Sequence, residues 1–155
     1  MAYTIGAKLN EQFNPAVDYG DRCGLGDIVE LFDNRKFVFV SASTSVTSYQ
    51  LVAIDSSHYV QAATSALASA ASRLGVAQNN ISAGSWGWVQ VRGLMTVNAL
   101  STCSSAVALY TSGTAGSVDD TSASQVKIGG LVLTGNITAA AATTAVAAVD
   151  LFTAL

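Results

Sequence analysis

The feature of this sequence that most restricts its fold is a succession of short β-type segments, each closed by turn-forming residues. Residues 27–32 (DIVELF) and 36–40 (KFVFV) are rich in β-branched and aromatic side chains, and Asp33, Asn34 and Arg35 between them suit a tight turn. Residues 46–55 and 58–63 repeat the arrangement around a polar turn, DSS. The sequence therefore predicts two consecutive pairs of strands.

The second half of the chain continues the pattern, with segments at 86–97, 106–112, 125–135 and 144–152 that are bounded by Gly, Asn, Asp or Ser. Residues 64–75 (TSALASAASRLG) are the one helix candidate, with Gly75 placed as a helix terminator, and a loop of small residues is the alternative. Many short strands in 155 residues predict a mainly β, single-domain β-sandwich or small β-barrel with at most one short helix.

The two ends of the chain differ from this pattern. Residues 1–26 contain the only proline and show no steady hydrophobic period, so we expect an extended N-terminal arm ahead of a β-rich domain at 27–155. The first ten residues lack the basic start and apolar run of a signal peptide, which favours synthesis in the cytoplasm. Residues 136–155 are apolar but built from Ala and Thr and interrupted by Asp150, so we expect them to be buried or interfacial rather than membrane-spanning.

Charge is scarce in this sequence. Charged residues make up 11% of it, against about 25% in an ordinary soluble domain. The net charge is −3 and the seven basic residues are scattered, which argues against binding of nucleic acid. A surface with few long charged side chains predicts that the chain belongs to an assembly.

A catalytic constellation is not evident. His58 is the only histidine, and although Asp55 and several serines are near it in sequence, no G-x-S-x-G nucleophile motif is present. A polar turn is the favoured interpretation of residues 55–58 over a hydrolase built on His58. We therefore expect no enzymatic activity and no cofactor.

Metal-ligand patterns are also weak. Cys23 and Cys103 match no metal-ligand spacing and are expected to be buried free thiols. Asp119 and Asp120 are adjacent, but consecutive residues point in different directions. They indicate a solvated turn or at most a loose cation site.

Both tryptophans lie in residues 83–93 (AGSWGWVQVRG). A strand there has two unlike faces, one with Trp86, Trp88, Gln90 and Arg92 and the other with Gly87, Val89, Val91 and Gly93. The valine face suits tight packing, whereas Trp together with Arg is typical of protein interfaces. Two alternatives stay open: the tryptophans cap the domain's own core while Arg92 reaches water, or they stack on a sugar or a base.

Residues 73–93 (RLGVAQNNISAGSWGWVQVRG), followed by LYTSGTAGSVDD and KIGGLVLTG, resemble the small capsid decoration, or cement, proteins of tailed bacteriophages. The resemblance covers roughly the last half of the chain. The matching residues are Gly75, Val76, Ala77, Ala83, Gly84, Gly87, Trp88, Val89, Arg92 and Gly93. It implies a β-rich protein without an active site, commonly a homotrimer, which binds the major capsid protein on the outside of the phage head and uses an N-terminal arm to reach a neighbouring subunit.

These observations lead to two predictions of function. The first is a virion structural protein that stabilises contacts between major capsid protein subunits, with no part in nucleic-acid or membrane binding. Its expected contact residues are Phe13, Pro15 and Tyr19 in the arm and Trp86, Trp88 and Arg92 on the strand face. The alternative is a receptor- or carbohydrate-binding β-domain, such as a head fibre or an adhesin tip, that uses exposed tryptophans as a stacking platform.

Overall fold

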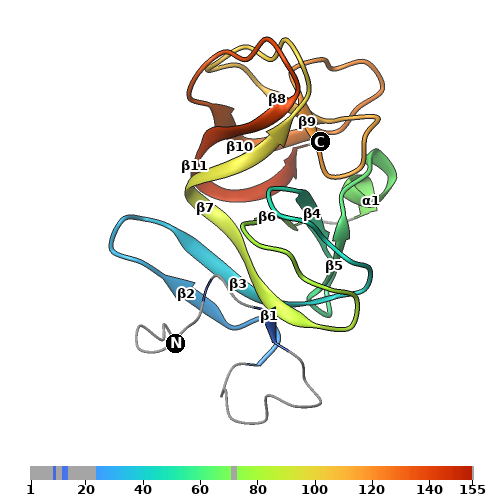
Figure 1. Ribbon diagram of the computed structural model, residues 1–155, viewed down its shortest axis with the longest axis vertical. Coiled ribbons are helices and arrows are strands. Elements are labelled where there is room, and N and C mark those ends of the chain that lie inside the picture. Colours follow the sequence, from blue (N-terminus) through green and yellow to red (C-terminus); the bar gives the residue numbers. More distant parts are fainter. Residues whose placement is uncertain (1–8, 10–11, 14–23, 71–72, 155) are drawn as a thin grey trace.

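The computed structural model describes residues 9, 12–13, 24–70 and 73–154, and within them the chain is mainly β with one short helix (Figure 1). The helix is α1 (Ser65–Ala70). The strands are β1 (Gln12–Phe13), β2 (Ile28–Glu30), β3 (Lys36–Ala42), β4 (Leu51–Ile54), β5 (Tyr59–Ala62), β6 (Arg73–Ala77), β7 (Trp86–Ala99), β8 (Leu109–Thr111), β9 (Val118–Asp119), β10 (Lys127–Leu133) and β11 (Ala141–Ala154). The predicted fold class is confirmed.

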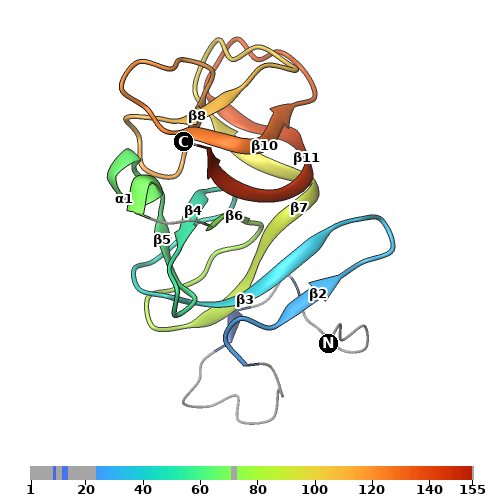
Figure 2. The ribbon, with the colours of Figure 1, turned by 180° about the vertical axis from the view of Figure 1, so that it is seen from behind.

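The long strand β7 is shared by two closed rings of strands (Figures 1 and 2). Its first half pairs with β3, and the ring continues through β5 and β4 to β6, which returns to β7. Its second half pairs with β11, and this ring continues through β10 and β8 to β9, which returns to β7 at Ala99. We call these the first barrel (β3–β7) and the second barrel (β7–β11).

The two barrels have separate but adjoining cores. Valines such as Val38, Val60 and Val89 fill the first barrel. The second core includes Met95 and Leu131 and extends to one face of β4 and β6. Alternate residues of these two strands therefore face different cores, as the period of two along a strand requires, which explains why β4 is buried at all four positions.

Both strand pairs predicted in the first half are confirmed: β2 and β3 are antiparallel across residues 31–35, and β4 and β5 across residues 55–58. The helix prediction over 64–75 is only partly right, because α1 ends at Ala70 and Gly75 belongs to β6. A Cβ atom at Gly75 would stand 3.1 Å from Val89 Cγ2. The glycine therefore allows β6 to pack against β7 and does not terminate a helix.

The predictions for the two ends of the chain have different outcomes. In the N-terminal segment, Gln12 and Phe13 pair with β7 opposite Gly87 and Trp86, while Pro15, Tyr19 and Cys23 lie outside the described residues. The boundary between arm and domain at residue 26 stays a prediction. At the other end, β11 pairs along β7 with Ala145, Ala147 and Leu151 buried, but most of the other residues from 136 to 152 are exposed, so the segment as a whole is not buried and an interfacial role stays a prediction. The described residues include no helix of the length and hydropathy needed to cross a membrane.

Candidate functional site

The strand that carries both tryptophans has the two unlike faces that its sequence predicts. Val89 and Val91 lie in the core of the first barrel, while Trp88 lies on the opposite, outer side. There Trp88 packs against Phe39, which is its direct neighbour across the β3–β7 pairing, with ring centroids 4.9 Å apart. Trp86 meets the same Phe39 edge to face at 6.0 Å.

The outer aromatic cluster, which we define as Val29, Phe37, Phe39 and Trp88, is covered by the chain itself. Leu9, Leu25, Leu31 and Trp86 pack against it as partly buried residues. Trp88 is only 1% exposed, so it offers no stacking face, and the idea of two exposed tryptophans is wrong for this residue. The hairpin of β2 and β3 closes over the strand face and buries the ring. Trp86 is half-buried and stays a predicted contact residue.

Burial of this face leaves polar groups inside the protein. Gln90 is 1% exposed, and its amide donates to the carbonyl oxygens of Arg92 and Leu94 at 2.9 and 2.8 Å. The Nε1 of Trp88 and the Nε of Arg92 are buried with no hydrogen-bond partner among the described residues. The hydrophobic contacts of the cluster therefore offset an unpaired indole N–H.

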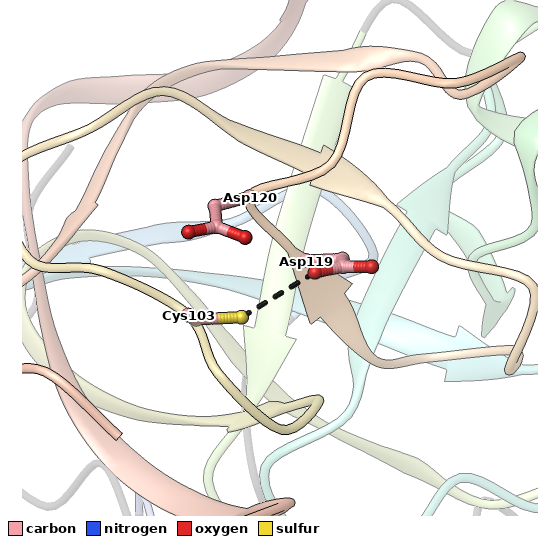
Figure 3. A group of neighbouring side chains, drawn as sticks. All are labelled: Cys103, Asp119 and Asp120. Atoms are coloured by element: carbon pink, nitrogen blue, oxygen red, sulfur yellow. Dashed lines mark hydrogen bonds between the residues drawn. The ribbon is translucent and has the colours of Figure 1, made fainter. Parts of the chain in front are cut away.

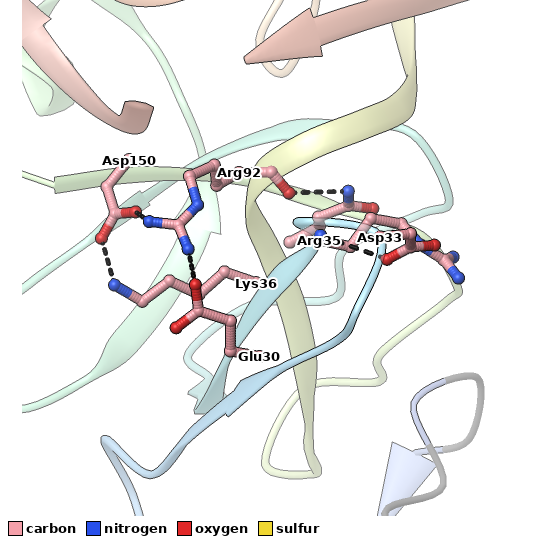
Figure 4. A network of polar contacts seen from close by, with 7 residues as sticks. Glu30, Asp33, Arg35, Lys36, Arg92 and Asp150 are labelled. Carbon is pink, nitrogen blue, oxygen red and sulfur yellow. Dashed lines mark hydrogen bonds and ion pairs between the residues drawn. The ribbon is translucent and has the colours of Figure 1, made fainter. Parts of the chain in front are cut away.

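Arg92 lies at the centre of a charge network that connects the two barrels (Figure 4). Its guanidinium pairs with Glu30 of β2 and, at 3.3 Å, with Asp150 of β11. Lys36 of β3 completes the network, with Nζ 2.6 Å from the other oxygen of Asp150. The Arg92 side chain is 19% exposed and its charge is already paired. Its predicted contact with a partner subunit stays a prediction.

A fully exposed phenylalanine, Phe32, stands at the tip of the β2–β3 hairpin. Two interactions close the tip: Leu31 N–H donates to Arg35 O at 2.8 Å, and Arg35 Nε pairs with Asp33 at 2.7 Å. Asn34 has a positive φ of 69°, which asparagine tolerates better than most residues. The sequence analysis places Phe32 in a strand and does not identify it as a contact residue. Phe32 directly precedes the turn residues Asp33, Asn34 and Arg35, and this position indicates that its side chain is exposed.

A pocket of about 270 Å³ lies between α1 and the outer side of β4 and β5. Its apolar side is formed by Ala53, Ile54, Leu67 and Ala70, and its polar side by Ser43, Asp55, Ser56, Tyr59 and Gln61. Tyr59 is 44% exposed. Sequence reasoning could not find this pocket, because its residues come from four separate segments.

A second cavity, of about 370 Å³, lies along β7 near Leu9, Phe37, Leu94 and Met95. Its amide side chains are used within the chain. Gln78 donates to Thr96 O and accepts from Thr96 N–H, at 3.0 and 3.2 Å. Gln90, as described above, is bonded to two backbone carbonyls. Both N–H donors of Gln90 and one donor and one acceptor of Gln78 therefore stabilise the strand crossing.

Cys103, Asp119 and Asp120 form a small cluster in the second barrel, with their ligand atoms within 4.8 Å of one another (Figure 3). Hydrogen bonds account for this arrangement: Cys103 Sγ–H donates to Leu100 O at 3.2 Å and lies 3.6 Å from Asp119 Oδ1, and Asp120 accepts from Ser104 N–H at 2.8 Å. Burial raises the pKa of the Cys103 thiol, and the Asp119 carboxylate raises it further. The prediction that Cys103 is a buried free thiol is confirmed.

The segment around His58 is a polar turn, as the sequence predicts. Asp55 Oδ1 accepts hydrogen bonds from the N–H groups of Ser57 and Tyr59, at 2.8 and 2.9 Å, and His58 N–H donates to Asp55 O at 3.1 Å. The imidazole lies directly over Gly26, where a Cβ atom would stand 2.6 Å from it. The Asp55 carboxylate thus organises the turn.

Comparison with known proteins gives a likeness of fold. No protein-family model and no curated protein matches the chain. Among solved structures, it is similar to the N base of the head fibre gp8.5 of bacteriophage phi29, with a TM-score of 0.53 and 19% sequence identity. The match covers 74% of this chain and 94% of that one. The chain therefore shares its fold with the base of a phage head fibre.

Proposed function

We propose that this chain is a structural protein of a bacteriophage virion, attached to the outer surface of the head. The observation that carries the proposal is the fold shared with the phi29 head-fibre base over 94% of that protein's length. The resemblance of the second half of the chain to capsid decoration proteins supports the same location. The major capsid protein is the proposed partner, and a homotrimer is the proposed assembly.

The part of the molecule around the first barrel, which carries β1 and the β2–β3 hairpin, is the proposed attachment region (Figure 1). Phe32 supports this assignment, because the hairpin turn holds its side chain fully in water. An exposed aromatic ring of this kind contributes strongly when it enters a pocket on a partner. Trp86 lies at the start of β7 beside β1, at the opposite end of the β3–β7 pairing from the hairpin tip, and is a second proposed contact. Phe13, Pro15 and Tyr19 are the proposed contacts of the N-terminal segment.

Co-sedimentation with capsids assembled from the same phage's major capsid protein tests the proposal. The wild-type chain is expected to sediment with the capsids, and Phe32→Ser or deletion of residues 1–26 is expected to reduce the bound fraction at least tenfold. Val107→Ser is the matched control, because Val107 is an exposed apolar residue in the loop before β8, in the second barrel. A wild-type chain that stays in the supernatant contradicts the proposal.

The same particles distinguish the two kinds of head protein. A decoration protein that stabilises contacts between capsid subunits raises the temperature at which the heads release their DNA, because it binds the intact shell in preference to the disrupted one. A fibre base attaches without changing that temperature. We propose the stabilising role, and an unchanged release temperature on fully occupied heads would assign the chain to the fibre class.

A further inference from the structure

We propose that the pocket between α1 and β5, beside Tyr59, binds a single neutral sugar ring. The proposal goes beyond head attachment and does not depend on it, because it concerns a different face of the first barrel. Nothing in the fold likeness assigns this pocket. It rests on the chemistry of the side chains that converge there.

The pocket combines the two kinds of surface that a pyranose ring requires. A sugar presents a flat array of C–H groups on one face and hydroxyl groups, which both donate and accept, around its edge. Leu67, Ala53 and the partly exposed ring of Tyr59 provide apolar contacts. Gln61 and the serines provide both donors and acceptors, and Asp55 provides an acceptor.

The polar groups of this pocket are available to a ligand. The side chains of Ser43, Ser56, Tyr59 and Gln61 make no hydrogen bond or ion pair with any described residue. Asp55 uses only Oδ1 for its turn, and its Oδ2 has no partner in the described part of the chain. In the larger cavity along β7, by contrast, the glutamine amides are bonded within the chain. A pocket with unused donors and acceptors around an apolar floor is typical of a binding site.

The volume of the pocket and the charge of its lining residues limit the class of ligand that can bind. The volume of about 270 Å³ is just below the range of roughly 300–1,000 Å³ typical of drug-sized ligands, which suits one monosaccharide unit. The lining residues include one acidic side chain, Asp55, and no basic one. A phosphate, a uronic acid or a sialic acid would meet this carboxylate without a cation to pair with. The ligand class is therefore a neutral hexose or N-acetylhexosamine, as part of a surface glycan.

Titration of the full chain with glucose, galactose, mannose and N-acetylglucosamine, followed by NMR of the backbone amides, tests the proposal. At least one of these sugars is expected to shift the amide signals of residues 55–61 and 65–70. N-acetylneuraminic acid is expected to leave them unchanged. Tyr59→Ala is expected to weaken binding about tenfold, since an aromatic contact contributes up to about that factor.

Further variants distinguish a loss of sugar binding from a loss of folding. Asp55→Asn retains an oxygen to accept the turn hydrogen bonds and removes the charge, and Gln61→Ala removes only the amide; both are expected to weaken binding. Phe32→Ser, which the proposed function expects to weaken capsid attachment at least tenfold, should bind sugar normally, and Tyr59→Ala should attach to capsids normally. The proposal is overturned if no neutral sugar binds at tens of millimolar, if the acidic sugar binds better, or if Trp86→Ala abolishes binding while Tyr59→Ala does not.

Discussion

Gly87 of β7 lies so close to Ile81 that a Cβ atom built on the glycine would stand 2.8 Å from Ile81 Cδ1 and 3.0 Å from its Cγ1. Ile81 is 1% exposed and belongs to the core of the first barrel, where its side chain has little room to move. The glycine between the two tryptophans therefore makes room for an isoleucine.

Gly87→Ala is expected to destabilise the protein by about 1–3 kcal/mol, the usual cost of overpacking a core. Ile81→Val removes the Cδ1 atom that the new methyl group would meet. The double variant is therefore expected to lose less stability than the sum of the two single variants, as measured by urea denaturation. Strict additivity would show that the two residues do not compete for the same space.

The Arg92–Asp150 ion pair joins β11 to the strand that both barrels share, and we expect it to stabilise the fold. Asp150→Asn removes the charge that pairs with both Arg92 and Lys36, whose side chains are 19% and 17% exposed. The free energy of unfolding, measured by urea denaturation, is expected to fall by about 1–2 kcal/mol, because Lys36 loses its carboxylate partner and Arg92 keeps only Glu30. Asp33→Asn is the control, since the Asp33–Arg35 pair lies at the exposed hairpin tip, and no measurable change is expected. Equal effects of the two substitutions would argue against this stabilising role.

The two tryptophans are expected to respond differently to substitution. Trp88→Ala empties the centre of the outer aromatic cluster, and its expected cost is about 3–5 kcal/mol. Trp86→Ala removes a half-buried ring from the margin of that cluster and is expected to cost clearly less. Thermal unfolding followed by circular dichroism measures both. If Trp86→Ala leaves the fold intact but lowers capsid binding, Trp86 is a contact residue; unchanged binding would remove it from the proposed surface.

The Cys103 thiol is expected to react slowly in the folded protein. Burial raises its pKa, and the nearby Asp119 carboxylate adds to the shift. The thiolate, which is the reactive form, is therefore scarce at neutral pH. In a Cys23→Ser background, alkylation by iodoacetamide should be much slower in buffer than in urea and should accelerate only at a more alkaline pH than for an ordinary thiol. Equal rates in buffer and urea would contradict the burial of this group.

The same shift has a consequence for stability. Because the folded-state pKa lies above the unfolded-state value, the contribution of Cys103 is complete below the unfolded pKa and is lost as the pH rises through the folded pKa. Urea denaturation should therefore show a loss of stability on the alkaline side that is absent from Cys103→Ala. A loss of equal size in this variant would assign the effect to another group.

Local chemistry was sufficient to predict much of the fold. The turn at residues 33–35, the turn around Asp55 and the two faces of residues 86–92 follow from residue types and from the period of two along a strand. The closure of the two rings could not be predicted in this way. It depends on pairings between distant segments, such as the parallel pairing of Ser41 with Tyr59 and the pairing of Val97 with Thr143. Gly75 shows the limit clearly: its role depends on Val89, fourteen positions away on another strand.

The candidate sites were harder to predict for the same reason. The sequence identifies Trp88 as unusual, but its burial depends on a hairpin that folds back over it. Cys103 lies sixteen or more positions from Asp119 and Asp120 in the sequence, and no spacing motif indicates that the three side chains are neighbours. The pocket at Tyr59 needs a helix to be placed beside a strand pair. Each of these sites is a product of tertiary structure.

The closed rings decide where another polypeptide could extend the sheet. Among the described strands, only β1 and β2 have a neighbour on one side alone, and they stand at the two ends of the strand order. Partners that join by strand addition, whether a capsid loop or the arm of a sister subunit, are therefore expected to use β1 or β2. The other described strands each pair with a neighbour on both sides over at least part of their length.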